Sequence, residues 1–523
     1  MEAKILEKFV LDLPGYYSMS EKQQENVSKL REISKKFLDR AKITYDTSDV
    51  VSSNTIVLES GHQPNFLPHA GTWKKAFLLH QIHTTLEGNS NYSVAFFGLA
   101  DQNLSTARVL SKNQLPTLNK EGRIKIGFKI NAADKFKSFC SVPKPTPENW
   151  EKEITKIQQH YFDIAKKSRS EEIFPKKQWE NVNELLWNSY ELADNFAELN
   201  SIIFARICNE LLGIHLCFFL YSDMSHDTLF LEESQEILRN LSRFNQSYNS
   251  VIKQKGLDIP QVTPYHLPFW YNCECGTKIN LLLEGPFTSV AKCPLCNKEY
   301  ELDFGDDFYY LSRYYDKMDF NAVSRNSAMA DGLGDTLFIS GFGGSLQYGQ
   351  ISDQVSRDLG FHRPVSLAWR SGDYYLGMTH RAAFHDLTRH FLLTSPDFLT
   401  SAFHQKIAQV FHRISDSLND AQSSNNQKEV KYLRGMLSNA KNIADFAKNM
   451  FSLTPSFLDI LVNQDTEEIV HAWKEALECA EIQSLPGIFL IQKDINYYTH
   501  LLSDIPPDDL SVLYKNIRNI EVE

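Results

Sequence analysis

The chain has 523 residues, more than one hydrophobic core normally organises, so two or three domains are expected. Its 65 acidic and 54 basic side chains give a net charge of −11, which argues against a nucleic acid or an anionic membrane as the main partner. Since the sequence has neither a run of about 20 apolar residues nor a signal-peptide pattern at its start, we expect a cytoplasmic protein.

The first half of the chain alternates predicted strands with predicted helices. Strands are expected at 55–59, 92–97 and 214–221, and helices within 1–50, at 72–86 and over most of 152–212. This alternation predicts an α/β fold with a Rossmann-like, doubly wound parallel sheet. Ligands of such sheets bind beyond the carboxyl ends of the strands, so the residues that follow each strand are candidate site residues.

The loop after the first strand carries polar groups suited to a ligand. Residues 60–65 read Ser-Gly-His-Gln-Pro-Asn, in which Gly61, His62 and Gln63 come directly after the strand. The imidazole and amide groups can donate and accept hydrogen bonds, and Lys75 on the next helix could add positive charge. His62 is a candidate acid or base, although a histidine in a turn is more often structural.

The next two strands also end in polar residues. Asp101, Gln102 and Asn103 follow the second strand, and Asp223 follows the third. An aspartate at such a position is either a helix cap or a functional carboxylate. Asp101 is therefore a candidate catalytic residue, and the other three are candidate ligand-binding residues.

Four of the eight cysteines have the spacing of metal ligands. Cys273 and Cys275 form one close pair and Cys293 and Cys296 a second, with a β-rich segment between them. Four thiolates from two such turns can surround one tetrahedral Zn²⁺, and Gly276 permits the tight first turn. Because sulfur would fill all four positions, the zinc is expected to be structural. Two disulfides or four unrelated thiols are the alternatives, of which disulfides are disfavoured in a reducing compartment.

Glycines follow the strand predicted at 336–340. Gly341, Gly343 and Gly344 allow the backbone to take a positive φ and to approach a ligand closely. If a helix starts near Ser345, its first amide groups and positive dipole end suit a phosphate or a carboxylate. A tight strand-to-helix turn without any ligand is the alternative.

The last part of the chain has the apolar spacing of paired helices. Residues 407–418 and 430–451 each repeat apolar side chains at a three-four spacing, and the polar stretch 422–427 lies between them. This pattern predicts an antiparallel coiled-coil hairpin. Its apolar stripe would be buried within the hairpin or against a second subunit, so a homodimer through the coiled coil is expected.

Several of these segments occur in an order known from one protein family. They are Ser60 to Pro64 with Lys75, the strand ending at Asp101, then Arg325, the Gly341 loop with Tyr348, and Arg370. Over residues 55–375 this order and spacing resembles the BshC family, the cysteine ligases of bacillithiol biosynthesis. The resemblance implies a Rossmann-like core, a dimerising coiled coil, and a ligase that joins cysteine to the amino group of glucosaminyl-malate.

The chain departs from that family where the family carries titratable groups. Family members usually have glutamine in place of His62, a Glu-Asp-His-Asp run in place of residues 100–103, and an acidic residue in place of Ser345. These changes reduce the potential for acid–base chemistry and for Mg²⁺ binding. The cysteine-rich segment is also not typical of the family, so a divergent member is expected.

These features predict the following domains. A Rossmann-like α/β core in two parts, 1–264 and 304–385, is interrupted by a zinc-ribbon insertion at 265–303 and followed by a coiled-coil hairpin at 386–452 and a helical segment at 453–523.

The expected function is that of a BshC-like ligase, in which ATP and Mg²⁺ support the joining of an amino acid, cysteine or similar, to a small-molecule amine. His62 and Asp101 would be catalytic, and the Gly341 loop, Arg325 and Arg370 would bind the substrate or nucleotide. A nucleotide-sugar-dependent transferase and a catalytically inactive, ligand-binding paralogue are the alternatives.

Overall fold

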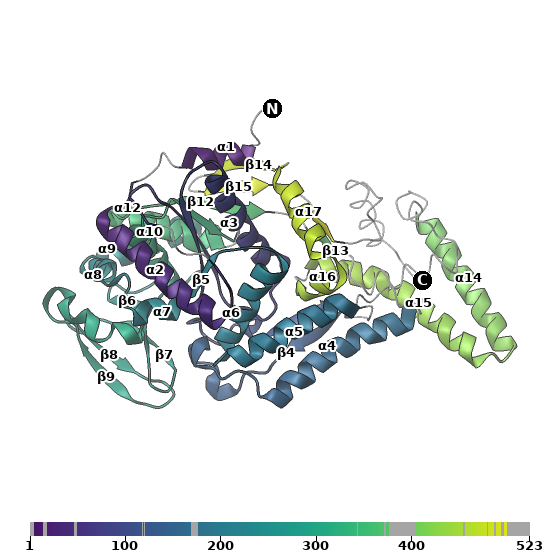
Figure 1. Ribbon diagram of the computed structural model, residues 1–523. Helices are drawn as coiled ribbons and strands as arrows, with labels where there is room; N and C mark the ends of the chain where they lie inside the picture. Colours follow the sequence, from purple (N-terminus) through teal and green to yellow (C-terminus); the bar gives the residue numbers. More distant parts are fainter. Residues whose placement is uncertain are drawn as a thin grey trace.

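The computed structural model describes residues 5–13, 18–45, 50–117, 119, 121–168, 176–341, 344–370, 373–375, 403–452, 455–478, 480–485, 488–492 and 496–498. A seven-stranded sheet lies at its centre (Figure 1). From edge to edge it consists of β14 (Glu481–Leu485), β15 (Ile488–Gln492), β12 (Val365–Arg370), β11 (Leu337–Ser340), β1 (Ile56–His62), β2 (Ser93–Leu99) and β5 (Cys217–Leu220). All neighbours pair in parallel except β14 with β15, which confirms the predicted α/β class and its mostly parallel sheet.

The order of the parallel strands locates a reversal in the sheet. In chain order they are β1, β2, β5, β11, β12 and β15, so their order across the sheet is 3-2-1-4-5-6. The chain runs outward from β1 in one direction, then returns to β11 on the other side of β1 and runs outward again. This is the strand order of the doubly wound dinucleotide-binding fold, whose crevice lies at the reversal.

The two faces of the sheet carry separate apolar clusters. Along β1, Val57 belongs to one cluster and Leu58 to the other, because successive residues of a strand point to opposite faces. Helices α3 (Ala70–Gly88) and α6 (Phe196–Arg206) contribute to the cluster of Leu58, and α2 (Glu21–Arg40) and α10 (Ala322–Leu333) to that of Val57. The central strands are thus buried on both faces, as is usual for parallel sheets.

The segment 453–523 is predicted to be helical, but it contributes β14 and β15 to the sheet. Further helices and two strand pairs complete the described structure. They are α1 (Ile5–Asp12), α4 (Pro147–Ser168), α5 (Lys176–Leu192), α7 (Tyr221–His226), α8 (Leu231–Arg239), α9 (Leu241–Lys255), α12 (Gln350–Leu359), α16 (Leu458–Asn463) and α17 (Thr466–Glu478), with the strand pairs β3 (Lys112–Pro116) and β4 (Arg123–Gly127), and β13 (Asp373–Tyr375) and β16 (Asn496–Tyr498).

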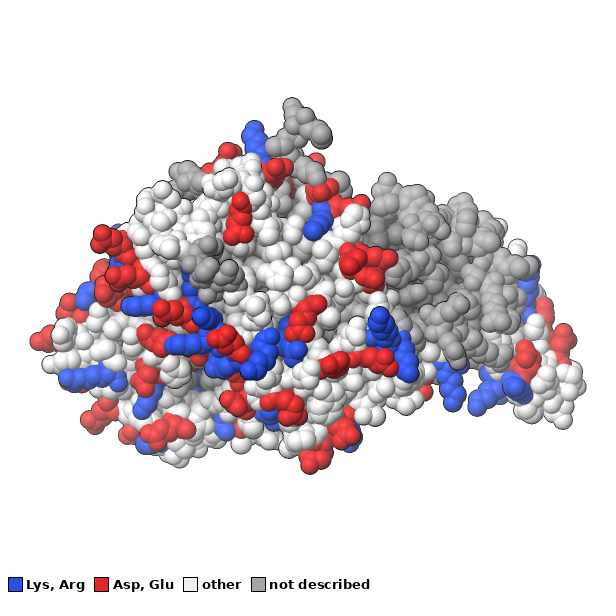
Figure 2. All heavy atoms as spheres, viewed as in Figure 1, with Lys and Arg blue, Asp and Glu red and all other residues white. Residues whose placement is uncertain are grey.

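Figure 2 shows basic and acidic side chains alternating along the face that carries α2. Lys22 and Lys36 of that helix form ion pairs with Glu233 and Asp227, which tie α2 to α8 and to the end of α7.

Two antiparallel hairpins carry the four clustered cysteines. Strands β6 (His266–Asn272) and β7 (Lys278–Leu282) form the first hairpin, and β8 (Thr288–Lys292) and β9 (Glu299–Asp303) form the second. Strand β10 (Met318–Phe320) pairs with β6, so the hairpins are anchored to the chain that leads back into the core. They lie at the lower left of Figure 1.

Two helices project from the other side of the molecule (Figure 1). They are α14 (Phe403–Ser423) and α15 (Gln427–Ser452), and they pack against each other. Val410 and Ile414 of the first helix and Val430 and Leu433 of the second are buried, so this part of the apolar stripe is covered. In the described part of the chain, none of the helices combines the length and apolar character needed to cross a membrane.

Candidate functional site

A cavity of about 730 Å³ lies at the carboxyl ends of four neighbouring strands. Its lining includes His62 at the end of β1, Asn103 after β2, Tyr221 after β5 and Gly344 after β11. Strands β1 and β11 are the pair at which the strand order reverses, and doubly wound sheets bind their ligands at that point. Each of the four strand ends singled out in the sequence therefore contributes to one cavity.

Part of the cavity wall comes from residues that sequence reasoning missed. Trp270 lies on β6, Lys278 and Asn280 lie on β7, and Asn321 caps α10. The clearest available signal was the position of Lys278, a charged residue that opens an otherwise mostly apolar strand beside the cysteine pair. The β6–β7 hairpin, which carries Cys273 and Cys275 in its turn, thus forms part of the cavity wall.

The described lining residues favour an anionic ligand. They include two basic side chains, Lys278 and Arg325, and no carboxylate. His62 and His266 also line the cavity, and burial lowers the pKa of both, which favours their neutral forms. A phosphate or carboxylate group would meet Arg325 and Lys278 in the cavity wall, although Lys278 already forms an ion pair with Asp319 behind it.

His62 has a fixed orientation in the cavity. Its Nδ1 lies 2.8 Å from the carbonyl oxygen of Gln63, so Nδ1 carries the proton and Nε2 is left as a hydrogen-bond acceptor. Burial, with a smaller contribution from the charge of Lys75, lowers the pKa of His62 to about 3. The neutral ring can therefore orient a donor such as an amine, whereas a cationic ring would repel a protonated one.

Lys75 lies next to the cavity without lining it. Its Nζ donates a hydrogen bond to the carbonyl oxygen of Gly61, and the side chain is buried. Burial, helped by the charge of Arg325 and opposed by that of Glu59, lowers the pKa of Lys75 to about 7. The predicted ligand-binding lysine thus supports the loop after β1 from within the core.

Two glycines of neighbouring strands make room for Tyr221. Gly61 of β1 pairs with Gly98 of β2, and a Cβ atom on either would lie 2.4 or 2.3 Å from the phenol group of Tyr221. The hydroxyl of Tyr221 lies 3.5 Å from Oε1 of Glu59 in the core. Gly61 is therefore required by the packing of Tyr221, which closes the cavity above the buried carboxyl group.

Arg325 connects the cavity to a buried acidic pair. Its guanidinium carbon lies 4.4 Å from the ring centroid of Tyr221, in cation–π geometry. Burial raises the pKa of Glu59, although the hydrogen bond with Asp335 and the charge of Arg325 oppose it. Burial and the proximity of Glu59 likewise raise the pKa of Asp335, so the two carboxyl groups hold protons more tightly than exposed ones.

Asp101, after β2, is hydrogen-bonded to the first turn of α7. Its Oδ1 accepts a hydrogen bond from the backbone N–H of Ser222 at 3.0 Å and its Oδ2 one from the Ser222 hydroxyl at 2.5 Å. Burial raises its pKa to about 7 despite these two bonds. The carboxylate is not among the lining groups of the cavity. It accepts hydrogen bonds from the first turn of α7 without being its N-cap residue, which is Leu220.

The other predicted residues are divided between the cavity and its surroundings. Asn103 lines the cavity and donates a hydrogen bond to Oε1 of Gln63 at 3.3 Å. Gln102 is buried, and Asp223 forms an ion pair with Arg40 of α2 at 3.0 Å. The expectation that Asp223 opens onto the crevice is thus wrong, since Tyr221 takes that place at the end of β5.

The loop after β11 leads directly into a helix, as predicted. A π-helical turn over Ser345–Gly349 continues into α12. Gly344 lies at the start of this helix with a φ of −66°, so the expected positive φ is not found there. Gly344 and Tyr348 line the cavity, Gly343 lies outside the described residues, and Arg370 at the end of β12 is not among the lining residues.

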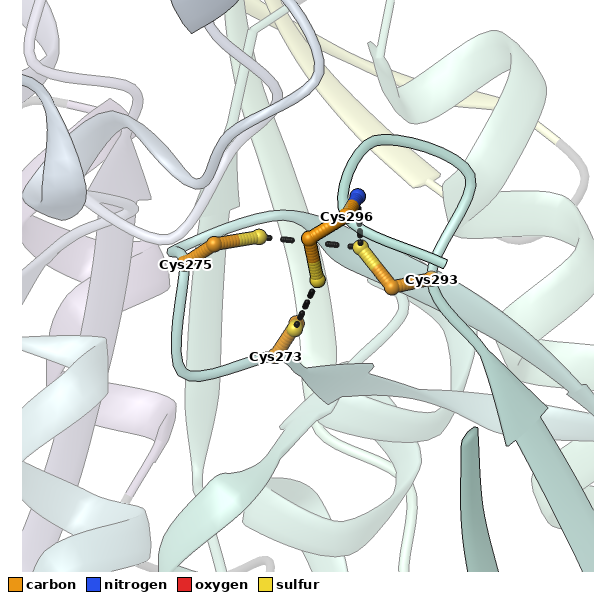
Figure 3. A group of neighbouring side chains, drawn as sticks. All are labelled: Cys273, Cys275, Cys293 and Cys296. Carbon is orange, nitrogen blue, oxygen red and sulfur yellow. Dashed lines mark hydrogen bonds between the residues drawn. The ribbon is translucent and has the colours of Figure 1, made fainter. Parts of the chain in front are cut away.

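The four cysteines form a compact cluster. Cys273 and Cys275 lie in the turn between β6 and β7, and Cys293 and Cys296 in the turn between β8 and β9. Figure 3 shows their thiol groups converging. All four sulfur atoms lie within 4.8 Å of one another, with 3.5 Å between those of Cys273 and Cys296 and 3.6 Å between those of Cys275 and Cys293.

This donor set fits a tetrahedral metal ion. With Zn–S bonds of about 2.3 Å, the edge of a regular ZnS₄ tetrahedron is about 3.8 Å, close to the two sulfur pairs above. Burial opposes ionisation of the Cys293 thiol, but hydrogen bonds from the amides of Cys296 and Leu295 outweigh it and lower the pKa, whereas burial raises the pKa of Cys273. The convergence of four sulfur atoms, rather than the pKa of any one thiol, shows that the cluster could hold a metal ion.

Comparison with known proteins leaves the family of this chain open. No protein-family model matches it, and no curated protein sequence matches it at a significant level.

Proposed function

We propose that the chain is an enzyme that binds a nucleotide in the cavity at the strand reversal and uses it to join an amino acid to an amine. The proposed activity is that of a BshC-like C–N ligase with cysteine or a similar amino acid as one substrate. The observation that carries it is a cavity at the switch point of a 3-2-1-4-5-6 sheet with two basic side chains and no carboxylate among its described lining residues.

The lining suits the two ends of a nucleotide. Arg325 can neutralise a phosphate oxygen, and Lys278, whose charge is shared with Asp319, can donate its remaining hydrogen to another. The helix that starts at Gly344 adds amide groups from its first turn. Trp270 and Tyr248 offer aromatic surfaces on which a base can stack. The alternative of a nucleotide-sugar-dependent transferase would use the same groups, so the identity of the bound base separates the two.

Amide formation assigns roles to these residues. ATP activates the carboxyl group of the amino acid by transferring a phosphoryl or adenylyl group to one of its oxygens. The nitrogen of the amine then bonds to the carbonyl carbon, phosphate or AMP leaves, and the amine loses a proton. Arg325 would bind the activated acyl group and Nε2 of His62 would orient the amine, while Asp101 holds the loop after β2 in place through Ser222.

The remaining proposals concern structure. We propose that the four-cysteine hairpins are a zinc ribbon with one structural Zn²⁺, which would cross-link the two turns. We also propose that α14 and α15 form a coiled-coil hairpin through which two chains associate in the cytoplasm. Light scattering tests the association directly, because a dimer doubles the mass.

Nucleotide binding is tested by thermal unfolding with ATP, ADP, UDP and GDP. A ligand at one hundred times its dissociation constant adds about 2.7 kcal/mol to stability, which raises the melting temperature measurably. ATP and ADP are expected to stabilise the protein, and Arg325→Met to abolish the effect. Arg357→Met is the matched control, because Arg357 lies on the exposed side of α12 and pairs with Asp353.

Activity is then tested with ATP, cysteine and a panel of small amines. A product whose mass equals cysteine plus amine minus water, formed together with ADP or AMP, would support the ligase. Stabilisation by uridine or guanosine diphosphates alone would favour the transferase, and stabilisation by none of the nucleotides would exclude a nucleotide-dependent enzyme.

A further inference from the structure

The turn that carries Cys273 and Cys275 fixes the start of β7. The backbone N–H of Gly276 donates to the carbonyl oxygen of Cys273 at 2.7 Å, and that of Cys273 donates to the carbonyl oxygen of Thr277 at 2.9 Å. Gly276 has a φ of +85°, which favours glycine. The sulfur of Cys275 lies 3.2 Å from the hydroxyl of Thr277. The position of this thiol is therefore linked to that of Thr277 and of Lys278, the first residue of β7.

Lys278 runs from this turn into the cavity wall. Its Nζ donates to the carbonyl oxygen of Gln102 at 2.5 Å and forms an ion pair with Asp319 at 2.8 Å. The side chains of both ion-pair partners are almost fully buried, and Nζ also lies 5.6 Å from the ring centroid of Trp270. Lys278 therefore joins β7, β10 and the loop after β2 at a single buried charge.

A second connection runs through the backbone of residues 136–141. Ser138 N–H donates to the carbonyl oxygen of Gly276 at 2.9 Å, and Lys278 N–H donates to that of Phe136 at 3.1 Å. In the same segment, Phe139 N–H donates to the carbonyl oxygen of Asn103 at 2.8 Å. Residues 136–141 are thus hydrogen-bonded both to the turn that carries Cys273 and Cys275 and to the loop after β2, which lines the cavity.

The contact between the turn and this segment is tight. A Cβ atom on Gly276 would lie 2.6 Å from the Cβ atom of Ser141, so the turn can dock only with glycine at that position. Because interiors are close-packed, a change in the shape of the turn must be passed on to its neighbours.

We propose that the four-cysteine centre sets the affinity of the cavity for its anionic ligand, and that Lys278 and residues 136–141 transmit this effect. A bound metal holds four sulfur atoms at tetrahedral distances; without it the turn loses the constraint that positions Lys278 and the loop after β2. Lys278 is a positioning and charge-bearing residue in this scheme. The affinity part of the proposal rests on the proposed function, whereas the structural coupling does not.

The coupling is tested by hydrogen–deuterium exchange of the full chain with and without metal, the metal being removed by a chelator. The amides of Ser138 and Phe139 should lose protection together with those of the cysteine turns. The β3–β4 hairpin serves as the internal control, and its amides should exchange at the same rate in both states. Unchanged protection at Ser138 and Phe139 in metal-free protein whose cysteine turns have opened would overturn the coupling.

The affinity is measured with ATP and with inorganic pyrophosphate as probes. Metal removal and Lys278→Met should each weaken binding about tenfold or more, because a hydrogen-bonded charge is lost or displaced. Lys278→Arg should restore part of the affinity, and Lys292→Met, which removes an exposed lysine of β8, should leave it unchanged. The metal content of Lys278→Met should remain at the wild-type level.

Lys278→Met removes the amine and also leaves the buried carboxylate of Asp319 without its partner. A second variant distinguishes these two effects. Lys278→Met combined with Asp319→Asn keeps the buried site neutral, and the weaker binding should persist in it. Wild-type affinity in both the metal-free protein and the double variant would refute the proposal. Failure of both probes to bind wild-type protein would instead refute the proposed function, and the exchange experiment would then decide the coupling alone.

Discussion

At the scale of single residues, Tyr221 fills space that only glycine leaves open on two adjacent strands. Gly61 and Gly98 are paired in the register of β1 and β2, and both lie against the phenol ring. The ring in turn separates the cavity from Glu59 and supports the guanidinium group of Arg325. By leaving room for the ring, the two glycines thus determine the positions of Tyr221 and, through it, of the guanidinium group of Arg325 in the cavity wall.

Replacement of Gly98 by alanine should therefore destabilise the fold. The added Cβ would lie 2.3 Å from Cζ of Tyr221, and overpacking of this kind typically costs about 1–3 kcal/mol. Gly88→Ala is the matched control, since no atom lies within 4 Å of its added Cβ and alanine favours the helix by about 0.5–1 kcal/mol. Urea unfolding measures both, and equal stability of the two variants would contradict the packing argument.

The buried carboxyl group of Asp101 should make stability depend on pH. Its pKa rises from 3.8 to about 7 on folding, so its contribution to stability is full below about pH 4 and is lost as the pH rises towards 7. The difference corresponds to roughly 4 kcal/mol. The asparagine of Asp101→Asn does not titrate. As the pH rises from 4 to 7, the unfolding free energy of this variant should therefore increase relative to that of wild type. Above pH 8 the difference between the two should stay constant. Parallel urea-unfolding profiles over the whole range would show that the carboxyl group is not perturbed.

At the scale of elements, each antiparallel hairpin places one cysteine pair in its turn. Strand pairing within β6–β7 and within β8–β9 is local, so each hairpin by itself brings the two cysteines of its own turn close together. The short loop spacings alone fix which cysteines share a turn. The distance between the two turns depends on how the hairpins pack.

One equivalent of zinc per chain is expected in protein purified without added metal. Cys293→Ser should abolish it, because three sulfur ligands and a hydroxyl bind the ion less well. Cys140→Ser is the control, since Cys140 lies outside the cluster and contacts Ser138. Elemental analysis measures the zinc content of each protein. A full equivalent of zinc in Cys293→Ser would show that Cys293 is not a metal ligand.

At the scale of the whole molecule, the strand order gathers residues from distant parts of the chain. His62 and Gly344 are separated by most of the core in sequence, yet β1 and β11 are neighbours in the sheet. Arg370 ends the next strand, β12, and is not among the lining residues. Arg325 reaches the cavity from α10, whereas Arg370 ends a strand that lies beyond β11 in the sheet. Their positions in the fold, which the sequence did not show, thus distinguish the two predicted arginines.

Gly344 and Arg370 allow this arrangement to be tested. Gly344→Val should fold normally, because the backbone is helical there and no atom lies within 4 Å of an added Cβ, but the larger side chain should weaken ATP binding about tenfold or more. Arg370→Ala should change the affinity by less than about twofold. The affinity of each folded variant is measured by titration with ATP. If Arg370→Ala weakened binding more than Gly344→Val did, the ligand would lie outside this cavity.

The sequence by itself determined the local features. The alternation of strands and helices, the glycine loop before a helix, the cysteine pairs and the apolar stripe of α14 and α15 all follow from patterns within about 30 residues, because they reflect hydrophobic periodicity and turn chemistry. The α/β class and the mostly parallel sheet follow from the same patterns.

Only the tertiary structure decided which polar groups face the cavity. Asp101 and Asp223 follow strands as predicted, but Asp101 accepts hydrogen bonds from Ser222 in the first turn of α7, and Asp223 forms an ion pair with Arg40. Lys278 and Trp270 line the cavity from the β6–β7 hairpin, which the sequence marked only by its cysteines. The direction of a side chain at a strand end depends on partners brought there by non-local packing, and no local pattern encodes those partners.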